Sequence, residues 1–218
     1  DLHKLCGRSR APPLRMQDYR IRQKSMSISA YENQVAAKNN MKNVFSVRKP
    51  TRSDKIDYGK TGVYFITVCT EKKQKILSDV TGNCNLNEGD PQARHMPLQK
   101  VVLLPCGKIA EIQLLLLEKR FKNVSVKHYV VMPNHIHIIL CIDNSNQNSE
   151  PENTTLTAVM CAFKSLTSKM CKKEYGIEKV FQRSFYDHVI RDRDDYEKHA
   201  RYIYENPMKW FYDDLYVR

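Results

Sequence analysis

Two apolar runs separated by Pro-Asn are the strongest indication of the fold. They lie in the stretch His128-Tyr-Val-Val-Met-Pro-Asn-His-Ile-His-Ile-Ile-Leu-Cys141. β-Branched and aliphatic residues dominate both runs, which predicts strands over 124–132 and 136–142 joined as an antiparallel hairpin. Side chains alternate along a strand, so His135 and His137 should point the same way, roughly 6.5–7 Å apart along the backbone. The pair could share one metal ion or be polar decoration on a half-exposed strand, and spacing alone favours neither.

The chain has 218 residues and a formal net charge of +12, and most of the excess lies at its N-terminal end. Residues 1–50 contain 11 Lys or Arg against three acidic residues, with little periodic apolar content. We therefore predict a basic, flexible arm over 1–50 and a folded domain over 51–218. The charge favours a nucleic-acid partner, with an anionic membrane surface as the competing interpretation. The arm could itself bind nucleic acid.

Seven scattered cysteines never form a Cys-x-x-Cys pair, which fits neither a disulfide framework nor a cysteine zinc site. This usage predicts a reducing, cytoplasmic location. No run of about 18 apolar residues is present, so we expect no transmembrane helix and no membrane partner. The N-terminus also lacks the apolar core of a signal peptide.

Strand-like and helix-like patterns alternate over the rest of the chain. Beside the hairpin, we expect a strand over 62–70, a turn-rich loop or irregular hairpin over 78–100, a short strand over 101–104, helices over 105–120, 156–175 and 192–206, and short strands over 180–182 and 188–190. This order predicts an α+β, ferredoxin-like or RRM-like sandwich, a mainly antiparallel sheet with helices on its faces and a C-terminal helix. The lysine-rich face of helix 156–175 could be solvated or could face phosphates.

The last helix carries a tyrosine that the core does not require. Its apolar stripe consists of Tyr196, Ala200, Ile203 and Pro207. Tyr202 falls about 120° from the centre of that stripe. Asn206 lies one turn further on the face of Tyr202, about 6 Å along the axis. The two could be surface residues, with Asn206 ending the helix. Alternatively, a tyrosyl oxygen can attack phosphorus, and two histidines with an amide oxygen can hold Mg²⁺ or Mn²⁺ weakly.

Three blocks of sequence resemble the REP-associated tyrosine transposases (RAYTs), a branch of the single-tyrosine HUH transposases, in which HUH stands for histidine-hydrophobic-histidine. The blocks are Tyr129-Val-Val-Met-Pro-Asn-His-Ile-His137, Phe181-Gln-Arg-Ser-Phe-Tyr-Asp-His-Val-Ile-Arg-Asp192 and Tyr202-Ile-Tyr-Glu-Asn-Pro-Met-Lys-Trp210. They follow the order of the family, and the resemblance covers about residues 48–218. The basic arm is a departure from the compact family pattern.

The resemblance implies that Tyr202 is the nucleophile of a catalytic C-terminal helix. It also implies that His135, His137 and Asn206 bind the divalent metal, Mg²⁺ or Mn²⁺. The expected reaction is metal-dependent cleavage of single-stranded DNA, giving a 5′-phosphotyrosyl link and a free 3′-OH, followed by strand transfer. The protein would then be a transposase acting on hairpin-bearing DNA. It would be a bacterial-type, nucleoid-associated protein, active as a monomer or homodimer.

Other residues near these blocks have weaker assignments. Arg183 and Lys209 are candidate phosphate contacts or ordinary surface charges, and His188 and His199 are expected to be structural. A catalytically silent nucleic-acid-binding module on an RRM-like fold is the alternative function. A replication-initiator nickase shares the chemistry, but the flanking blocks fit it less well.

Overall fold

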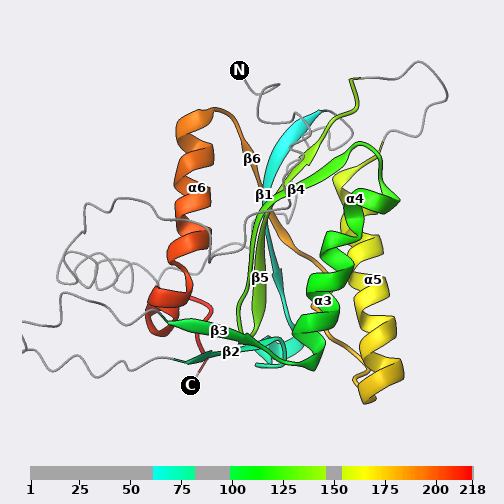
Figure 1. Ribbon diagram of the computed structural model, residues 1–218, viewed down its shortest axis with the longest axis vertical. Coiled ribbons are helices and arrows are strands. Elements are labelled where there is room, and N and C mark those ends of the chain that lie inside the picture. The colour runs from blue at the N-terminus through cyan, green and yellow to red at the C-terminus, as the bar shows by residue number, and fades with distance from the viewer. Residues whose placement is uncertain (1–60, 82–98, 146–153, 218) are drawn as a thin grey trace, which may run out of the picture.

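A four-stranded antiparallel sheet in the order β4-β5-β1-β6 forms the centre of the molecule (Figure 1). The computed structural model describes residues 61–81, 99–145 and 154–217, so the predicted arm over 1–50 lies outside the described residues. The order, with helical crossovers after the first and third strands, is the ferredoxin-like arrangement that the sequence predicts. Its strands are β1 (Gly62–Cys69), β4 (Val124–Val131), β5 (His135–Ile142) and β6 (Tyr186–Ile190).

Helices cover both faces of this sheet, as Figure 1 shows. One face packs against α3 (Pro105–Leu115), the short α4 (Leu117–Arg120) and α5 (Leu156–Tyr175). The other face packs against α6 (Arg193–Glu205), which is followed directly by the 3₁₀ helix η3 (Pro207–Tyr212). The prediction of helices on the faces of the sheet is confirmed. The expected helix over 105–120 is divided at Leu116.

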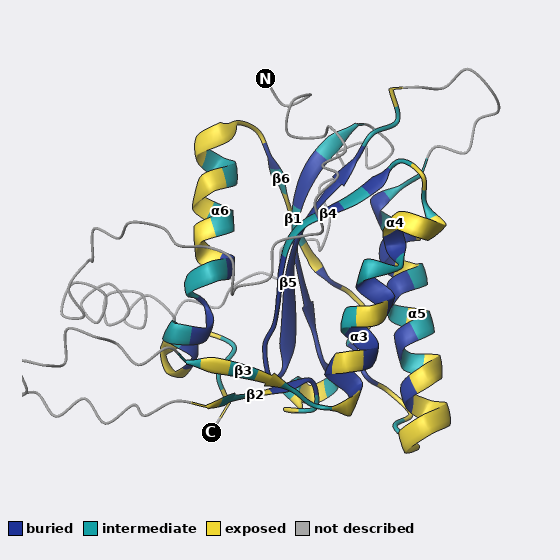
Figure 2. Ribbon diagram, viewed as in Figure 1, coloured by how far each residue is buried: buried dark blue, intermediate teal, exposed yellow. Residues whose placement is uncertain are grey.

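β5 is buried along its whole length and separates two apolar cores (Figure 2). Ile136, Ile138 and Leu140 point into the larger core, under α3 and α5. His135 and His137 belong to the opposite face, which lies under α6, because side chains alternate along the strand. The buried residues of that smaller core are Val63, Val130, Met132, Ile139, Cys141, Ile190, Ile203 and Trp210.

The limits of α6 follow from its sequence. Asp192 is the N-cap, and its carboxylate accepts a hydrogen bond from the Asp195 N–H at 2.8 Å. Ile203 is buried, and Tyr196 and Ala200 pack against the smaller core, so the predicted stripe is the face that meets the sheet. These contacts fix where α6 lies over β5.

One detail agrees with an alternative left open by the sequence, and two differ from the sequence-based expectations. The region 78–100 begins and ends in a second, two-stranded antiparallel sheet formed by β2 (Ser78–Thr81) and β3 (Lys100–Leu103), which fits the irregular-hairpin alternative. The expected strand over 180–182 is only an isolated bridge between Phe181 and Thr70, because the chain pairs there with the end of β1 at a single residue. The last strand begins at Tyr186 rather than 188.

Cys141 is disulfide-bonded. Cys69, Cys106, Cys161 and Cys171 are free thiols. Within the described ranges, no helix is both long and apolar enough to cross a bilayer.

α3 crosses the backbone of Leu77 at Gly107, and this contact gives a stability prediction. A Cβ at Gly107 would lie 1.8 Å from the Leu77 carbonyl oxygen, which already accepts the Leu104 N–H at 2.9 Å. We expect Gly107→Ala to lower the free energy of unfolding by about 3 kcal/mol, because the backbone must move to admit the methyl group. Urea denaturation measures the change. The exposed neighbour provides the control, since Lys108→Ala should cost less than about 0.5 kcal/mol; equal losses would contradict the prediction.

Candidate metal and tyrosine site

His135 and His137 lie side by side at the start of β5, on the face covered by α6. Their ring centroids are 4.5 Å apart, and the two residues are 0% and 3% exposed. In the register with β1, His137 is opposite Thr67 and His135 is opposite Cys69. The histidines are thus a buried pair rather than decoration on a half-exposed strand.

In both imidazoles the Nδ1 atom makes a hydrogen bond, which orients the ring. His137 Nδ1 is 2.8 Å from the Thr67 hydroxyl, and His135 Nδ1 is 2.8 Å from Asn134 Oδ1. Because Asn134 Nδ2 donates to the Leu215 carbonyl at 2.7 Å, its Oδ1 must accept, which places the His135 proton on Nδ1. The hydroxyl of Thr67 can accept from His137 in the same way. The Nε2 atoms of both rings are buried and have no hydrogen-bond partner among the described residues.

Asn206 joins the histidine pair from the end of α6. Its side chain is buried, with 2% exposure of the residue, and Nδ2 donates to Asp213 Oδ2 at 2.9 Å. The remaining atom, Oδ1, is buried without a hydrogen-bond partner in the described part of the chain. The amide also lies close enough to His135 to favour the protonated form of that imidazole. The structure therefore brings the three predicted metal-binding residues together.

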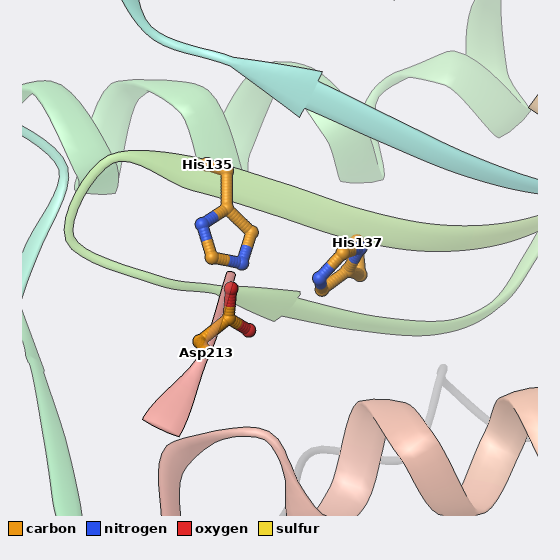
Figure 3. A group of neighbouring side chains, drawn as sticks. All are labelled: His135, His137 and Asp213. Atoms are coloured by element: carbon orange, nitrogen blue, oxygen red, sulfur yellow. The ribbon is translucent and has the colours of Figure 1, made fainter. Parts of the chain in front are cut away.

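Asp213 is a further member of the site, and the sequence reasoning missed it. One ligand atom from each of His135, His137 and Asp213 lies within 4.8 Å of the others, and Figure 3 shows the carboxylate facing the two rings. Asp213 Oδ1 accepts the Leu215 N–H at 2.7 Å, which fixes the carboxylate. Its position depends on η3, which turns the chain back toward β5 after α6. In the sequence, an acidic residue after the last predicted helix does not by itself indicate a metal ligand.

Burial keeps the two imidazoles neutral. Loss of hydration lowers the pKa of His135 to about 4, although the charge of Asp213 and the Asn206 amide oppose this shift. Burial also lowers the pKa of His137 well below its usual value, and the neighbouring His135 and His199 act in the same direction. At neutral pH both imidazoles are therefore neutral, and because the His135 proton is on Nδ1, the Nε2 atom of His135 carries a lone pair.

These pKa shifts predict acid-sensitive folding. The pKa of His135 is about 4 in the folded chain and near 6.5 when unfolded, so the unfolded state binds more protons between these values. The free energy of unfolding should fall as the pH drops below 6.5, by roughly 3 kcal/mol for this group once the pH passes 4. Urea denaturation of metal-free protein at pH 7.5 and pH 4 measures the loss. His135→Gln should lose less stability over this interval, and equal losses would refute the assignment.

Tyr202 lies next to His137 on the exposed side of α6. Its ring meets the imidazole edge to face, with a centroid separation of 5.0 Å, and makes a similar contact with Phe65 at 5.9 Å. The residue is 44% exposed, so its ring has a buried side and a solvent side. The expectation that the core does not enclose Tyr202 agrees with this exposure. The Tyr202 ring therefore lies beside the histidine pair and is partly open to solvent.

The remaining predicted residues lie outside this cluster. Arg183 is exposed in the loop before β6, and Lys209 forms an ion pair with Glu205 at 2.6 Å. His188 Nε2 contacts the Asp195 carboxylate at 2.8 Å, and His199 Nδ1 donates to the Asp195 carbonyl at 2.8 Å. These contacts link β6 to the start of α6. Together with Asp195, both histidines form a second group that could hold a metal ion, so their expected structural role stays a prediction.

The donor set fits a divalent cation. Two imidazole nitrogens, an amide oxygen and a carboxylate suit Mn²⁺ and related ions, with coordination positions left for water or phosphate. Burying a polar atom without a partner costs on the order of 1–3 kcal/mol. Packing alone gives no reason for two Nε2 atoms and Asn206 Oδ1 to be buried together without partners.

The chain is similar to several known proteins, although it matches no protein-family model. An uncharacterized protein of Haemophilus influenzae is 26% identical over 184 residues, covering 78% of this chain and 93% of that protein. A provisionally named REP-associated tyrosine transposase of the same organism is 23% identical, covering 73% and 77%. The REP-associated tyrosine transposase of Escherichia coli is 28% identical over 91 residues, covering 42% of this chain and 48% of that protein.

A solved structure of a REP-associated tyrosine transposase bound to a REP hairpin also aligns with the chain. The alignment covers 74% of this chain and 76% of the other, with a TM-score of 0.46 and 20% sequence identity. The two named transposases resemble the chain in sequence. The mixed fold has the antiparallel sheet expected from the order of strand-like and helix-like patterns. The chain is a RAYT-like protein, related in sequence to transposases.

Proposed function

We propose that this protein is a metal-dependent single-stranded DNA endonuclease and strand transferase that uses Tyr202 as its nucleophile on hairpin-bearing DNA. The observation that carries the proposal is the set of three buried atoms beside an exposed tyrosine, His135 Nε2, His137 Nε2 and Asn206 Oδ1. None of the three has a hydrogen-bond partner among the described residues. The choice of hairpin DNA follows the resemblance of the three sequence blocks to the RAYTs.

In the proposed reaction, the Tyr202 oxygen attacks phosphorus, and the bond from phosphorus to the 3′ oxygen breaks. The DNA is left as a 5′-phosphotyrosyl ester on one side, and the 3′ oxygen takes up a proton to become a free hydroxyl on the other. The reverse attack by a 3′-OH then transfers the strand and releases the tyrosine. A divalent cation would be held by His135, His137, Asn206 and Asp213, and when bound it would neutralise charge on the phosphate.

Residues around the ligands would set the geometry of this reaction. Thr67 and Asn134 hold the two Nδ1 atoms, so both rings present Nε2 to the cation. Asp213 accepts from Asn206 Nδ2 and so directs the amide oxygen toward the site. Phe65 contacts the rings of both His137 and Tyr202, and can keep the nucleophile at a fixed distance from the pair.

The alternative, a silent RRM-like binding module, fits the sheet less well. Such modules stack bases on aromatic side chains exposed on the face of the sheet. Here α6 covers the face that carries His135 and His137, and every residue of β5 is buried. A role limited to binding would also give no reason for the buried atoms of the site that lack a hydrogen-bond partner among the described residues.

A covalent-adduct assay tests the proposal. The full chain is incubated with labelled oligonucleotides that carry a hairpin and a single-stranded flank, in the presence of Mn²⁺, and is then denatured. We expect a labelled protein band that resists denaturation and is lost when EDTA is added. Binding that survives EDTA, with no adduct on any oligonucleotide of the panel, would instead establish the silent binding module.

A further inference from the structure

The turn that follows β1 has an unusual backbone. In η2 (Glu71–Lys73), Lys72 has φ 51° and Lys73 has φ 55°, and these are the only non-glycine residues with positive φ in the described ranges. Side chains with a Cβ rarely adopt this left-handed region, and two in succession are rarer still. Strain of this kind persists where the surrounding structure fixes it, and it is concentrated at functional sites.

Hydrogen bonds fix this turn against the residues that lead into His135. The Thr70 N–H donates to the Asn134 carbonyl at 2.9 Å, and the Leu77 N–H donates to the Pro133 carbonyl at 3.1 Å. The Thr70 hydroxyl can donate to the same Asn134 carbonyl, at 3.0 Å. The segment between Thr70 and Leu77 is therefore attached at both ends to the turn that holds the candidate metal site.

Two lysines exert their charge on this end of β1, and only one of them is engaged elsewhere. Burial raises the pKa of the Cys69 thiol, and the charges of Lys73 and Lys164 oppose that shift. Burial lowers the pKa of His135, and the charge of Lys73 acts in the same direction. Lys164 Nζ donates to the backbone carbonyls of residues 182, 183 and 184, at 2.5, 2.8 and 3.3 Å. The ammonium group of Lys73, which is only partly exposed, makes no hydrogen bond or ion pair with the described residues.

We propose that Lys73 binds a non-bridging oxygen of the DNA phosphodiester placed at His135 and His137. This inference rests on the proposed function and adds a residue that none of the three RAYT-like sequence blocks contains. The ammonium would stabilise the extra negative charge that develops on the phosphate oxygens as the tyrosine attacks. Within this left-handed turn Lys73 is partly buried, whereas the adjacent Lys72 is exposed.

A pair of matched variants separates this role from general charge. Lys73→Gln and Lys72→Gln each remove one positive charge from the same left-handed turn. With Mn²⁺ and saturating hairpin oligonucleotide, Lys73→Gln should slow single-turnover adduct formation by about 10- to 100-fold, whereas Lys72→Gln should stay within about 3-fold of the unmodified chain. Lys73→Arg should restore most of the rate, because it restores the charge. Equal effects of the two Gln variants would overturn the proposal.

Metal affinity tells this role from a structural one. A cation near the metal ligands repels the metal, so Lys73→Gln should bind Mn²⁺ at least as tightly as the unmodified chain, as measured by calorimetry. Weaker Mn²⁺ binding would mean that the substitution disturbs the fold of the site, and the proposal would fail.

Binding to single-stranded DNA decides the role of Lys73 even if no adduct forms. In the Tyr202→Phe background, Lys73→Gln should weaken binding and reduce the slope of log affinity against log salt by about 0.7, the value for one phosphate contact on a single strand. Lys72→Gln should leave that slope unchanged. An unmodified chain that forms no adduct would refute the proposed function alone, whereas an unchanged slope in Lys73→Gln would refute the phosphate contact.

Discussion

Tyr202→Phe should abolish the covalent adduct between this protein and hairpin DNA, lowering its rate of formation by at least about 1,000-fold, because no other group replaces the phenol oxygen as nucleophile. The phenylalanine ring keeps the edge-to-face contacts with His137 and Phe65, so the position of α6 should not change. Denaturing gels with end-labelled DNA measure the adduct, and band-shift titration measures binding. We expect the binding affinity to stay within about 3-fold.

Tyr204→Phe is the matched control for this experiment. Tyr204 lies two residues further on the same helix, and its substitution also removes a single phenol oxygen. We expect the Tyr204 variant to form the adduct at a rate close to that of the unmodified chain. An adduct in the Tyr202 variant would show that another residue is the nucleophile, and peptide mapping of the adduct would identify it.

His137→Ala and His135→Ala should each weaken Mn²⁺ binding by at least about 100-fold, because each removes one of the two imidazole ligands from a weak site. Adduct formation should fall in parallel at low Mn²⁺ concentration and recover in part at high concentration. Calorimetry or the electron paramagnetic resonance signal of free Mn²⁺ gives the affinity. Asp213→Asn should weaken the metal less than either alanine, since the amide still offers an oxygen but loses the charge.

A histidine outside the cluster provides the control for the metal measurements. His188 is exposed, and its Nε2 atom contacts the Asp195 carboxylate near the start of α6. His188→Ala should therefore leave Mn²⁺ affinity unchanged. If His188→Ala weakens Mn²⁺ as much as His137→Ala does, the cation binds elsewhere. If neither alanine variant of the pair alters Mn²⁺ affinity, the ligand assignment is wrong.

The sequence by itself predicted the frame of the molecule, because local patterns have local causes. Apolar alternation placed the hairpin strands, and the Pro-Asn break placed the turn between them. The Asp192 cap and the stripe of Tyr196, Ala200 and Ile203 defined α6. The alternation of β5 also put both histidines on one face, and helical spacing kept Tyr202 off the buried stripe. Each of these inferences needs only the period of a strand or a helix.

The tertiary structure alone decided how the distant groups meet. No local pattern shows that Asn134 fixes one imidazole through its own bond to Leu215, or that η3 returns Asp213 to the histidine pair. Likewise, the lysine-rich face of α5 gave no sign that Lys164 binds three carbonyls of the loop before β6. These relations join residues tens of positions apart, so they arise only when packing brings the ends of the strands and helices together.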